Sequence, residues 1–227
     1  VLPFYGYGRQ DRNADPRVPI SAKLVANLIQ AAGANRVLTM DLHAGQIQGF
    51  FDIPVDHLYS APVMIDYFKK KPFVKDTDSL VVLSPDAGGV ERARAFAKRL
   101  NCDLAVIDKR RISPREASVM HIVGDVKDKN VIIIDDIVDT AGTLCKSCEA
   151  LKNHGARTIS AGCSHPILAG PALERLCNAP IDELVVTNSI PLLVTKPKYI
   201  TVLSVGRLLA EAIKRIHSGS SVSELFV

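Results

Sequence analysis

The sequence predicts an α/β protein in which mostly parallel sheets are flanked by helices. Strand-like and helix-like patterns alternate along the chain, as they do when each strand is followed by a helix that covers the sheet. The run from Val131 to Ile134 is apolar and β-branched with polar neighbours, which is typical of a strand buried on both faces. With 227 residues and 47% hydrophobic content, the chain suffices for one large or two small domains.

Apolar spacing and helix-stopping glycines place the elements of the first half of the chain. We expect a helix, a strand, a second helix, and then a strand, turn and helix, over residues 21–33, 36–42, 61–71 and 79–100. Ser60 is the expected N-cap of the second helix. The charged segment 70–78 is where we expect a domain boundary.

The second half of the chain continues this alternation. Residues 104–111 predict a strand that ends in positive charge, 112–118 a loop, and 118–136 a hairpin leading into the β-branched run. Further strands are expected over 157–165, 182–189 and 199–204, and helices over 144–154, 170–178 and 205–219. The last of these helices is amphipathic and ends at Gly219.

The overall composition favours some classes of substrate and cellular location over others. A net charge of +4, without a long basic block, favours small anionic substrates over nucleic acid. No apolar stretch approaches the roughly 20 residues that a membrane helix needs, and no signal peptide is recognisable, so we expect a cytoplasmic protein without a membrane partner. Five cysteines argue against a disulfide framework, and Cys145 and Cys148 are interpreted as packing residues.

Two acids followed by a loop of small residues form the most informative motif. Asp135 and Asp136 follow the β-branched run, and residues 139–143 then lead into a helix N-terminus, where free amides and the helix dipole favour phosphate. Small residues let the backbone approach a ligand closely, and Gly142 can adopt backbone dihedrals that other residues avoid. A ligand with phosphate at one end and hydroxyls or a cation at the other, such as a sugar phosphate, explains both parts. The alternative is a strand with acids at its solvated end.

A second candidate ligand turn is SPDAGG, residues 84–89, between an expected strand and helix. Open α/β sheets bind ligands at this end of their strands, and Gly88 and Gly89 permit close approach of the backbone to a phosphate. Asp86 is a candidate ligand for a cation that bridges to such a phosphate. The alternative is a tight turn without a ligand.

Acidic residues and a histidine also follow the strand over residues 36–42. In an extended chain Asp41 and His43 project to the same side, where a carboxylate and an imidazole can share a metal or a phosphate. Asp52 and Asp56 add acid nearby. The alternatives are a structural histidine and solvated loop acids.

Two basic segments complete the set of motifs. In GRQDR, Arg9 offers donors for phosphate, and Gln10 and Asp11 can read hydrogen-bonding groups on a ring. Lys109 and Arg111 border a proline-containing loop that can close over a polyphosphate and deliver positive charge. The alternatives are a surface salt-bridge cluster and an exposed basic loop.

Several of these motifs resemble one known family. The string MDLHAGQIQGFFDIPVD resembles the signature of the ribose-phosphate diphosphokinases nearly position for position. The other matching strings occur in the family's order over essentially the whole chain: RQDR, PISAKLVANLI, SPDAGGVERAR, DKRR, VGDVKDKNVIIIDDIVDTAGT and LLAEAIKRIHSGSSVSELF. The resemblance implies transfer of the diphosphate of ATP to the 1-hydroxyl of ribose 5-phosphate, which gives phosphoribosyl diphosphate (PRPP) and AMP.

The resemblance also implies a role for each candidate site residue. Asp135 and Asp136 address the ribose hydroxyls or their metal, and the 5-phosphate is held by Asp139, Thr140, Ala141, Gly142 and Thr143. Lys109 and Arg111 belong to the catalytic loop. ATP is contacted by Arg9, Gln10, Asp11 and His43, and Mg²⁺ is the cofactor, with His43, Asp86, Asp41, Asp52 and Asp56 as its candidate ligands.

The family layout further implies two phosphoribosyltransferase-like, doubly wound domains. Residues 1–68 with the helix 205–227 are assigned to a first domain that lacks most of its N-terminal part, and 69–204 to the second. The implied assembly is a homo-oligomer, a hexamer built from dimers. Two alternatives stay open: a non-catalytic family member that acts as an assembly subunit, and a phosphoribosyltransferase that consumes PRPP.

Overall fold

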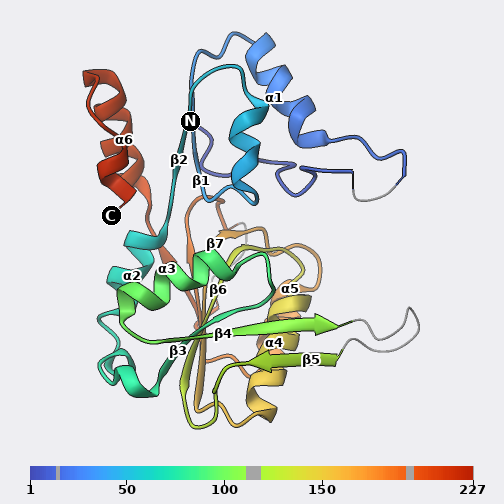
Figure 1. The fold of residues 1–227 in the computed structure, drawn as a ribbon, viewed down its shortest axis with the longest axis vertical. Coiled ribbons are helices and arrows are strands. Elements are labelled where there is room, and N and C mark those ends of the chain that lie inside the picture. Colours follow the sequence, from blue (N-terminus) through green and yellow to red (C-terminus); the bar gives the residue numbers. More distant parts are fainter. Residues whose placement is uncertain (14–15, 111–118, 193–196, 227) are drawn as a thin grey trace. The chain divides into compact units, whose positions relative to one another are not determined.

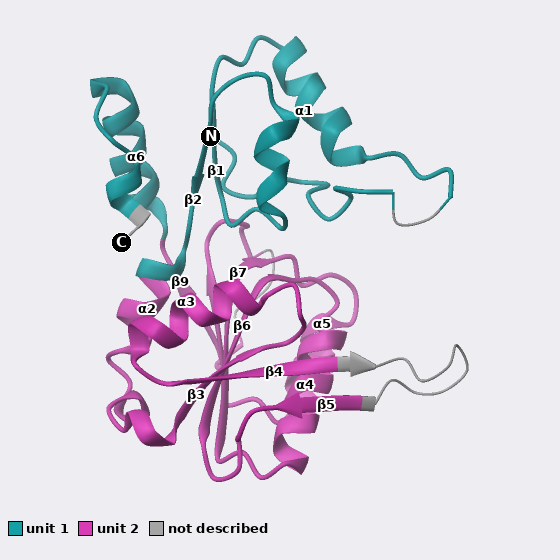
Figure 2. Ribbon diagram, viewed as in Figure 1, with its two compact units in different colours: residues 1–62, 205–227 teal, residues 63–204 magenta. Residues whose placement is uncertain are grey.

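The computed structural model describes residues 1–13, 16–110, 119–192 and 197–226. Contacts within the chain separate it into two compact units (Figure 2). Unit 1 comprises Val1–Pro62 and Val205–Val227, and unit 2 comprises Val63–Ser204. The first division lies between residues 62 and 63, whereas the sequence predicted a boundary between 68 and 69. The assignment of these units to phosphoribosyltransferase-like domains stays a prediction.

Helices and strands alternate over the described residues (Figure 1). The helices are α1 (Ser21–Ala31), α2 (Ala61–Phe68), α3 (Val90–Leu100), α4 (Gly142–Asn153), α5 (Ala172–Asn178) and α6 (Gly206–Ser218). The strands are β1 (Val37–Met40), β2 (Val55–Leu58), β3 (Leu80–Ser84), β4 (Asp103–Arg110), β5 (Val119–Val123), β6 (Asn130–Val138), β7 (Thr158–Pro166), β8 (Glu183–Thr187) and β9 (Ile200–Leu203). Short 3-10 helices occupy Gly45–Phe50, Pro72–Val74, Thr77–Ser79 and Ser223–Phe226.

Unit 2 is built on a seven-stranded sheet in the order β5-β4-β3-β6-β7-β8-β9. Every neighbouring pair is parallel except β4 with β5. The apolar run of β6 is buried throughout, because this strand lies at the centre of the sheet. The predicted α/β class with mostly parallel sheets is therefore confirmed.

Helices cover both faces of this sheet. Val131 and Ile133 of β6 belong to a core cluster that also contains apolar residues of α4 and α5. On the opposite face, Ile134 lies beside Gly162 of β7, and a Cβ on that glycine would meet Phe68 of α2 at 3.2 Å. The glycine therefore leaves room for α2 to pack closely on the sheet.

One predicted pairing is wrong. The sequence suggested a hairpin over residues 118–136, but β5 pairs antiparallel with β4, and β6 pairs with β3 and β7. A strand that is apolar on both faces is stabilised most by a central position, which gives it two strand neighbours and a helix layer on each side. The less buried β5 occupies the edge instead.

Unit 1 contains the parallel pair β1 and β2. The predicted start of α1 at Ser21 is confirmed, and the buried Ala22 and Ala26 pack into one apolar cluster. In a second cluster, Leu38, Met40 and Leu58 from these strands pack with Val205 and Ala212 at the C-terminal helix α6.

Across the part of the chain that the structure describes, no helix has the length and apolarity that crossing a membrane requires.

Candidate active site

The acid pair lies inside strand β6 rather than after it. This strand extends to Val138, beyond the predicted apolar run, and Asp135 is paired with Cys163 of the neighbouring β7. The pleat continues through both acids, so adjacent carboxylates start from opposite faces of the strand. The carboxyl end of a central parallel strand is where α/β sheets bind ligands.

The surroundings of the two carboxylates disfavour a negative charge on Asp135. The backbone N–H of Asp136 donates to Asp135 Oδ1 at 2.9 Å, and Asp136 itself is only 5% exposed. Burial, together with the hydrogen bond and the charge of Asp136, raises the pKa of Asp135 to about 8. The guanidinium of Arg92 opposes this shift only in part. The pair therefore carries negative charge that its protein surroundings do not fully neutralise.

Arg92 is a residue of the candidate site that the sequence interpretation did not name. It projects from α3, and its Nη1 lies 3.2 Å from Asp136 Oδ1. Arg92 lies in the string SPDAGGVERAR, just after the SPDAGG turn that was predicted to bind a ligand. Because β3 and β6 are adjacent and parallel, the helix that follows β3 begins beside the end of β6. That adjacency depends on the strand order, which the sequence interpretation did not predict.

The small-residue loop joins β6 to α4. Its left-handed residue is Ala141, with φ of 58°, so the loop does not use the conformational freedom of Gly142 for this turn. Gly142 is instead the first residue of α4. The carbonyl of Ala141 accepts the N–H of Cys145 at 2.9 Å, which closes the first turn. The loop therefore presents the N-terminus of a 12-residue helix at the edge of the sheet beside the acids.

The second predicted ligand turn lies beside the first. Ser84 Oγ donates to the carbonyl of Asp86 at 2.7 Å, and the N–H of Gly89 donates to Asp86 Oδ1 at 3.0 Å. A Cβ on Gly89 would lie 2.8 Å from Ser84 Oγ, so only glycine fits there, whereas Gly88 has no such close contact. Asp86 thus fixes the start of α3, as the tight-turn alternative requires. Its role toward a cation stays a prediction.

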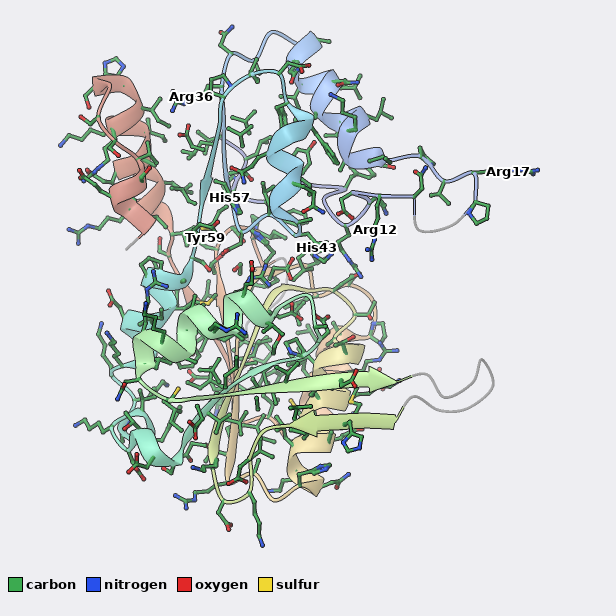
Figure 3. All side chains as sticks on the ribbon, viewed as in Figure 1. Arg12, Arg17, Arg36, His43, His57 and Tyr59 are labelled. Atoms are coloured by element: carbon green, nitrogen blue, oxygen red, sulfur yellow. The ribbon has the colours of Figure 1, made fainter. Side chains whose placement is uncertain are left out.

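Asp41 and His43 do not have the expected extended geometry. Strand β1 ends at Met40, and Asp41 has a left-handed φ of 42°, so the argument that the two side chains project to one side is wrong. Asp41 is 4% exposed, and its Oδ2 accepts the N–H of Ser60 at 2.9 Å. His43 is exposed in unit 1 (Figure 3).

The other two acids of unit 1 bind protein groups. Asp52 exchanges hydrogen bonds with Gln30, through its N–H to Gln30 Oε1 at 2.7 Å and through its Oδ2 from Gln30 Nε2 at 3.2 Å. Asp56 accepts from Arg36 Nε and Nη2 at 2.5 and 2.9 Å (Figure 3). That hydrogen bonding raises the pKa of Arg36. Among the described residues no group of three or more metal-ligating side chains converges, and the metal roles stay predictions.

Three of the predicted ATP-contacting residues, Arg9, Gln10 and Asp11, lie in the segment before α1. Gln10 donates its N–H to the carbonyl of Tyr7 at 2.9 Å, and its own carbonyl accepts the N–H of Ala22 at 3.2 Å. Asp11 Oδ2 accepts from Gln46 Nε2 at 2.9 Å, and Arg9 is exposed. These contacts give the segment a defined shape in unit 1 and leave its role toward ATP as a prediction.

Comparisons with known proteins decide the family. The model of the phosphoribosyl synthetase-associated domain matches residues 109–227, and that of the N-terminal domain of ribose phosphate pyrophosphokinase matches residues 1–33. The ribose-phosphate pyrophosphokinase of Campylobacter jejuni is 56% identical over 227 residues, which cover all of this chain and 72% of the relative. This chain belongs to the ribose-phosphate pyrophosphokinase family. It is therefore an enzyme.

Further members of the ribose-phosphate pyrophosphokinase family agree. The Helicobacter hepaticus protein of that name is 57% identical over 226 residues, covering all of this chain and 72% of the relative. The crystal structure of phosphoribosylpyrophosphate synthetase from Mycobacterium smegmatis matches with a TM-score of 0.88 and 39% identity, over 96% of this chain and 70% of that one. The resemblance inferred from the motifs is confirmed.

Of the two residues predicted to be catalytic in this pyrophosphokinase, one lies near the end of β4 and the other is not among the described residues. Lys109 is paired through its backbone with Met120 in the antiparallel ladder of β4 and β5. Arg111 lies outside the described residues. Their assignment to a catalytic loop stays a prediction.

Proposed function

We propose that this pyrophosphokinase transfers the diphosphate of ATP to the 1-hydroxyl of ribose 5-phosphate, giving 5-phosphoribosyl 1-diphosphate and AMP for nucleotide biosynthesis. One observation carries the proposal: an incompletely neutralised acid pair and a helix N-terminus follow each other at the end of one central strand. A sugar phosphate matches both, because its hydroxyls donate to carboxylates and its phosphate accepts from backbone amides.

The sugar phosphate is oriented by these two parts of the site. Amides of residues 139–143 and the dipole of α4 hold the 5-phosphate, which places the ring over Asp135 and Asp136. Arg92 fixes the orientation of the Asp136 carboxylate through their ion pair. Holding the sugar at both ends directs its 1-hydroxyl at the second substrate, so that attack on the β-phosphorus of ATP proceeds in line.

The second substrate is proposed to bind through residues whose roles come from the family resemblance. Arg9, Gln10, Asp11 and His43 contact ATP. Lys109 and Arg111 place positive charge at the diphosphate as it is transferred, which stabilises the charge that develops there. The geometry of this half of the site is therefore part of the proposal.

Magnesium fits the site as a cofactor. Mg²⁺ prefers oxygen ligands and usually binds through one or two carboxylates together with substrate phosphates. Asp135 and Asp136 supply two adjacent carboxylates, and the raised pKa of Asp135 shows that the site favours added positive charge. When bound, the ion neutralises charge on the transferred phosphates. Asp86, His43, Asp41, Asp52 and Asp56 are the further ligands suggested by the resemblance.

The direct test measures AMP formation from ATP with and without ribose 5-phosphate and Mg²⁺. We expect AMP only when both are present, and ribose without its phosphate to be a poor substrate because it leaves the anion loop empty. Absence of AMP from a correctly folded oligomer would favour a non-catalytic family member. Release of diphosphate from PRPP upon addition of a nucleobase would favour a phosphoribosyltransferase.

A homo-oligomer, specifically a hexamer built from dimers, is proposed on the family resemblance, and the cytoplasmic location stays a prediction. Light scattering on a size-exclusion column tests the assembly. A single peak at the monomer mass would contradict the hexamer.

A further inference from the structure

The loop between β6 and α4 is held from one side by the segment that follows β7. Three successive carbonyls of the loop accept hydrogen bonds from that segment. The pairs are Leu168 N–H to Val138 O at 3.1 Å, Ala169 N–H to Asp139 O at 3.0 Å, and Arg175 Nη1 to Thr140 O at 2.9 Å. These three hydrogen bonds fix the orientation of the three consecutive peptide planes that contain these carbonyls.

The orientation of these planes decides where the loop amides point. No cis peptide bond occurs among the described residues, and in a trans peptide the C=O and the next N–H point in opposite directions. The N–H groups of Asp139, Thr140 and Ala141 therefore point away from the segment that holds the carbonyls. The left-handed turn at Ala141, with φ of 58°, then brings the chain into α4. Successive amides in such a turn form an anion-binding concavity.

Of the three donors, Arg175 alone is a side chain. It projects from α5, is exposed, and lies close enough to the loop that a Cβ on Gly142 would be 3.4 Å from its Nη1. A charged donor makes a stronger hydrogen bond to a carbonyl than a neutral one.

We propose that Arg175 is a positioning residue for the sugar phosphate: by holding the carbonyl of Thr140, it directs the N–H of Ala141 toward the 5-phosphate. This inference rests on the proposed function of the loop. It assigns to α5 a part in substrate binding that none of the sequence motifs indicated. Because Arg175 is exposed, its removal should affect binding far more than folding.

The test compares Arg175→Met and Arg175→Lys with Arg157→Met. Arg157 is also exposed but precedes β7, at the opposite end of the strand from the loop, so its substitution matches the loss of charge. Calorimetry gives the dissociation constant for ribose 5-phosphate, and steady-state kinetics give KM for each substrate. We expect Arg175→Met to weaken ribose 5-phosphate binding about tenfold, as loss of a charged hydrogen bond does, with KM for ATP unchanged. Arg175→Lys should recover most of the binding, since one carbonyl needs only one donor.

Two results would overturn the proposal. One is an unchanged dissociation constant for ribose 5-phosphate in Arg175→Met. The other is an equal rise of KM for both substrates with a lowered melting temperature, which would indicate a general structural role. If the unsubstituted enzyme does not bind ribose 5-phosphate, the proposed function fails separately. In that case, inorganic phosphate titrated into the same three variants decides whether Arg175 supports the loop as an anion site.

Discussion

Asp135 and Glu183 are carboxylates of the same sheet, and their surroundings differ sharply. Glu183 begins β8, where Lys71 Nζ lies 2.7 Å from Oε2, Thr201 Oγ1 donates to Oε1 at 2.7 Å, and Tyr67 also donates. Burial alone would raise the pKa of Glu183, but these hydrogen bonds outweigh it and lower the pKa. At Asp135 burial is reinforced by Asp136, and the pKa rises to about 8.

We call Glu183 the structural acid and Asp135, because of its proposed role in substrate binding, the functional acid. Lys71, Thr201 and Tyr67 all bind the carboxylate of Glu183, whereas at β6 Arg92 pairs with Asp136 and offsets the raised pKa of Asp135 only in part. An acid that the protein leaves incompletely neutralised costs folding stability, and such groups gather at functional sites. Lys71, Thr201 and Tyr67 provide Glu183 with positive charge and hydrogen-bond donors. We infer that substrate and Mg²⁺ provide the same for Asp135.

The largest expected effect comes from removing the functional acid. Asp135→Asn should lower kcat/KM by about 100-fold, because the sugar loses an acceptor that orients it. The variant should unfold at no lower temperature than the parent at pH 8, since one of two repelling carboxylates is gone. AMP formation and thermal unfolding measure the two effects. Asp103→Asn, at an exposed position where β4 begins, is the control. Full activity in Asp135→Asn would break the comparison.

Removing the basic partner of the pair should have a smaller effect. Arg92→Met leaves Asp136 buried without its ion pair, and we expect kcat/KM to fall about tenfold, as loss of a charged hydrogen bond does. The matched control is Arg94→Met, an exposed arginine on the same helix. Equal losses in both variants would mean that the charge of α3, and not the contact with Asp136, matters.

The structural acid should show the reverse pattern. Glu183→Gln loses its ion pair with Lys71, and we expect the free energy of unfolding to fall by about 1 kcal/mol, a value kept small because the pair is partly exposed. The kcat/KM of the folded enzyme should not change. Urea unfolding, followed by an AMP assay on folded protein, measures both. A loss of activity without a loss of stability would place Glu183 in the catalytic machinery.

The effects of pH on stability have opposite signs at the two acids. The pKa of Asp135 is raised from 3.8 to about 8, so its folded form keeps a proton that the unfolded chain releases, and stability falls as pH rises through this range. The lowered pKa of Glu183 gives stability that is present above its unfolded pKa and lost on acidification.

Chemical denaturation at several pH values sharpens the comparison further. The difference in unfolding free energy between Asp135→Asn and the parent should grow from pH 5 to pH 8 in favour of the variant. The difference between Glu183→Gln and the parent should instead shrink below about pH 4. If this difference between Asp135→Asn and the parent did not change with pH, the pKa of Asp135 in the folded parent would equal its value in the unfolded chain.

What the sequence alone determined is local along the chain. The alternation of strands and helices, the buried run of β6, and the acids followed by a small-residue loop could all be predicted. Hydrophobic periodicity and helix-terminus chemistry act between residues a few positions apart, so they can be recognised in the sequence alone. The family signature was legible for the same reason, and the comparisons confirmed it.

The tertiary structure decided which distant groups meet. It placed β5 on β4 and not on β6, brought Arg92 to Asp136, and set Arg175 against the carbonyl of Thr140. It also put the left-handed turn at Ala141 and not at the neighbouring glycine. Each outcome depends on the order of strands in the sheet and on the helices packed against them. That order minimises exposed apolar surface over the whole of unit 2, which no single segment encodes.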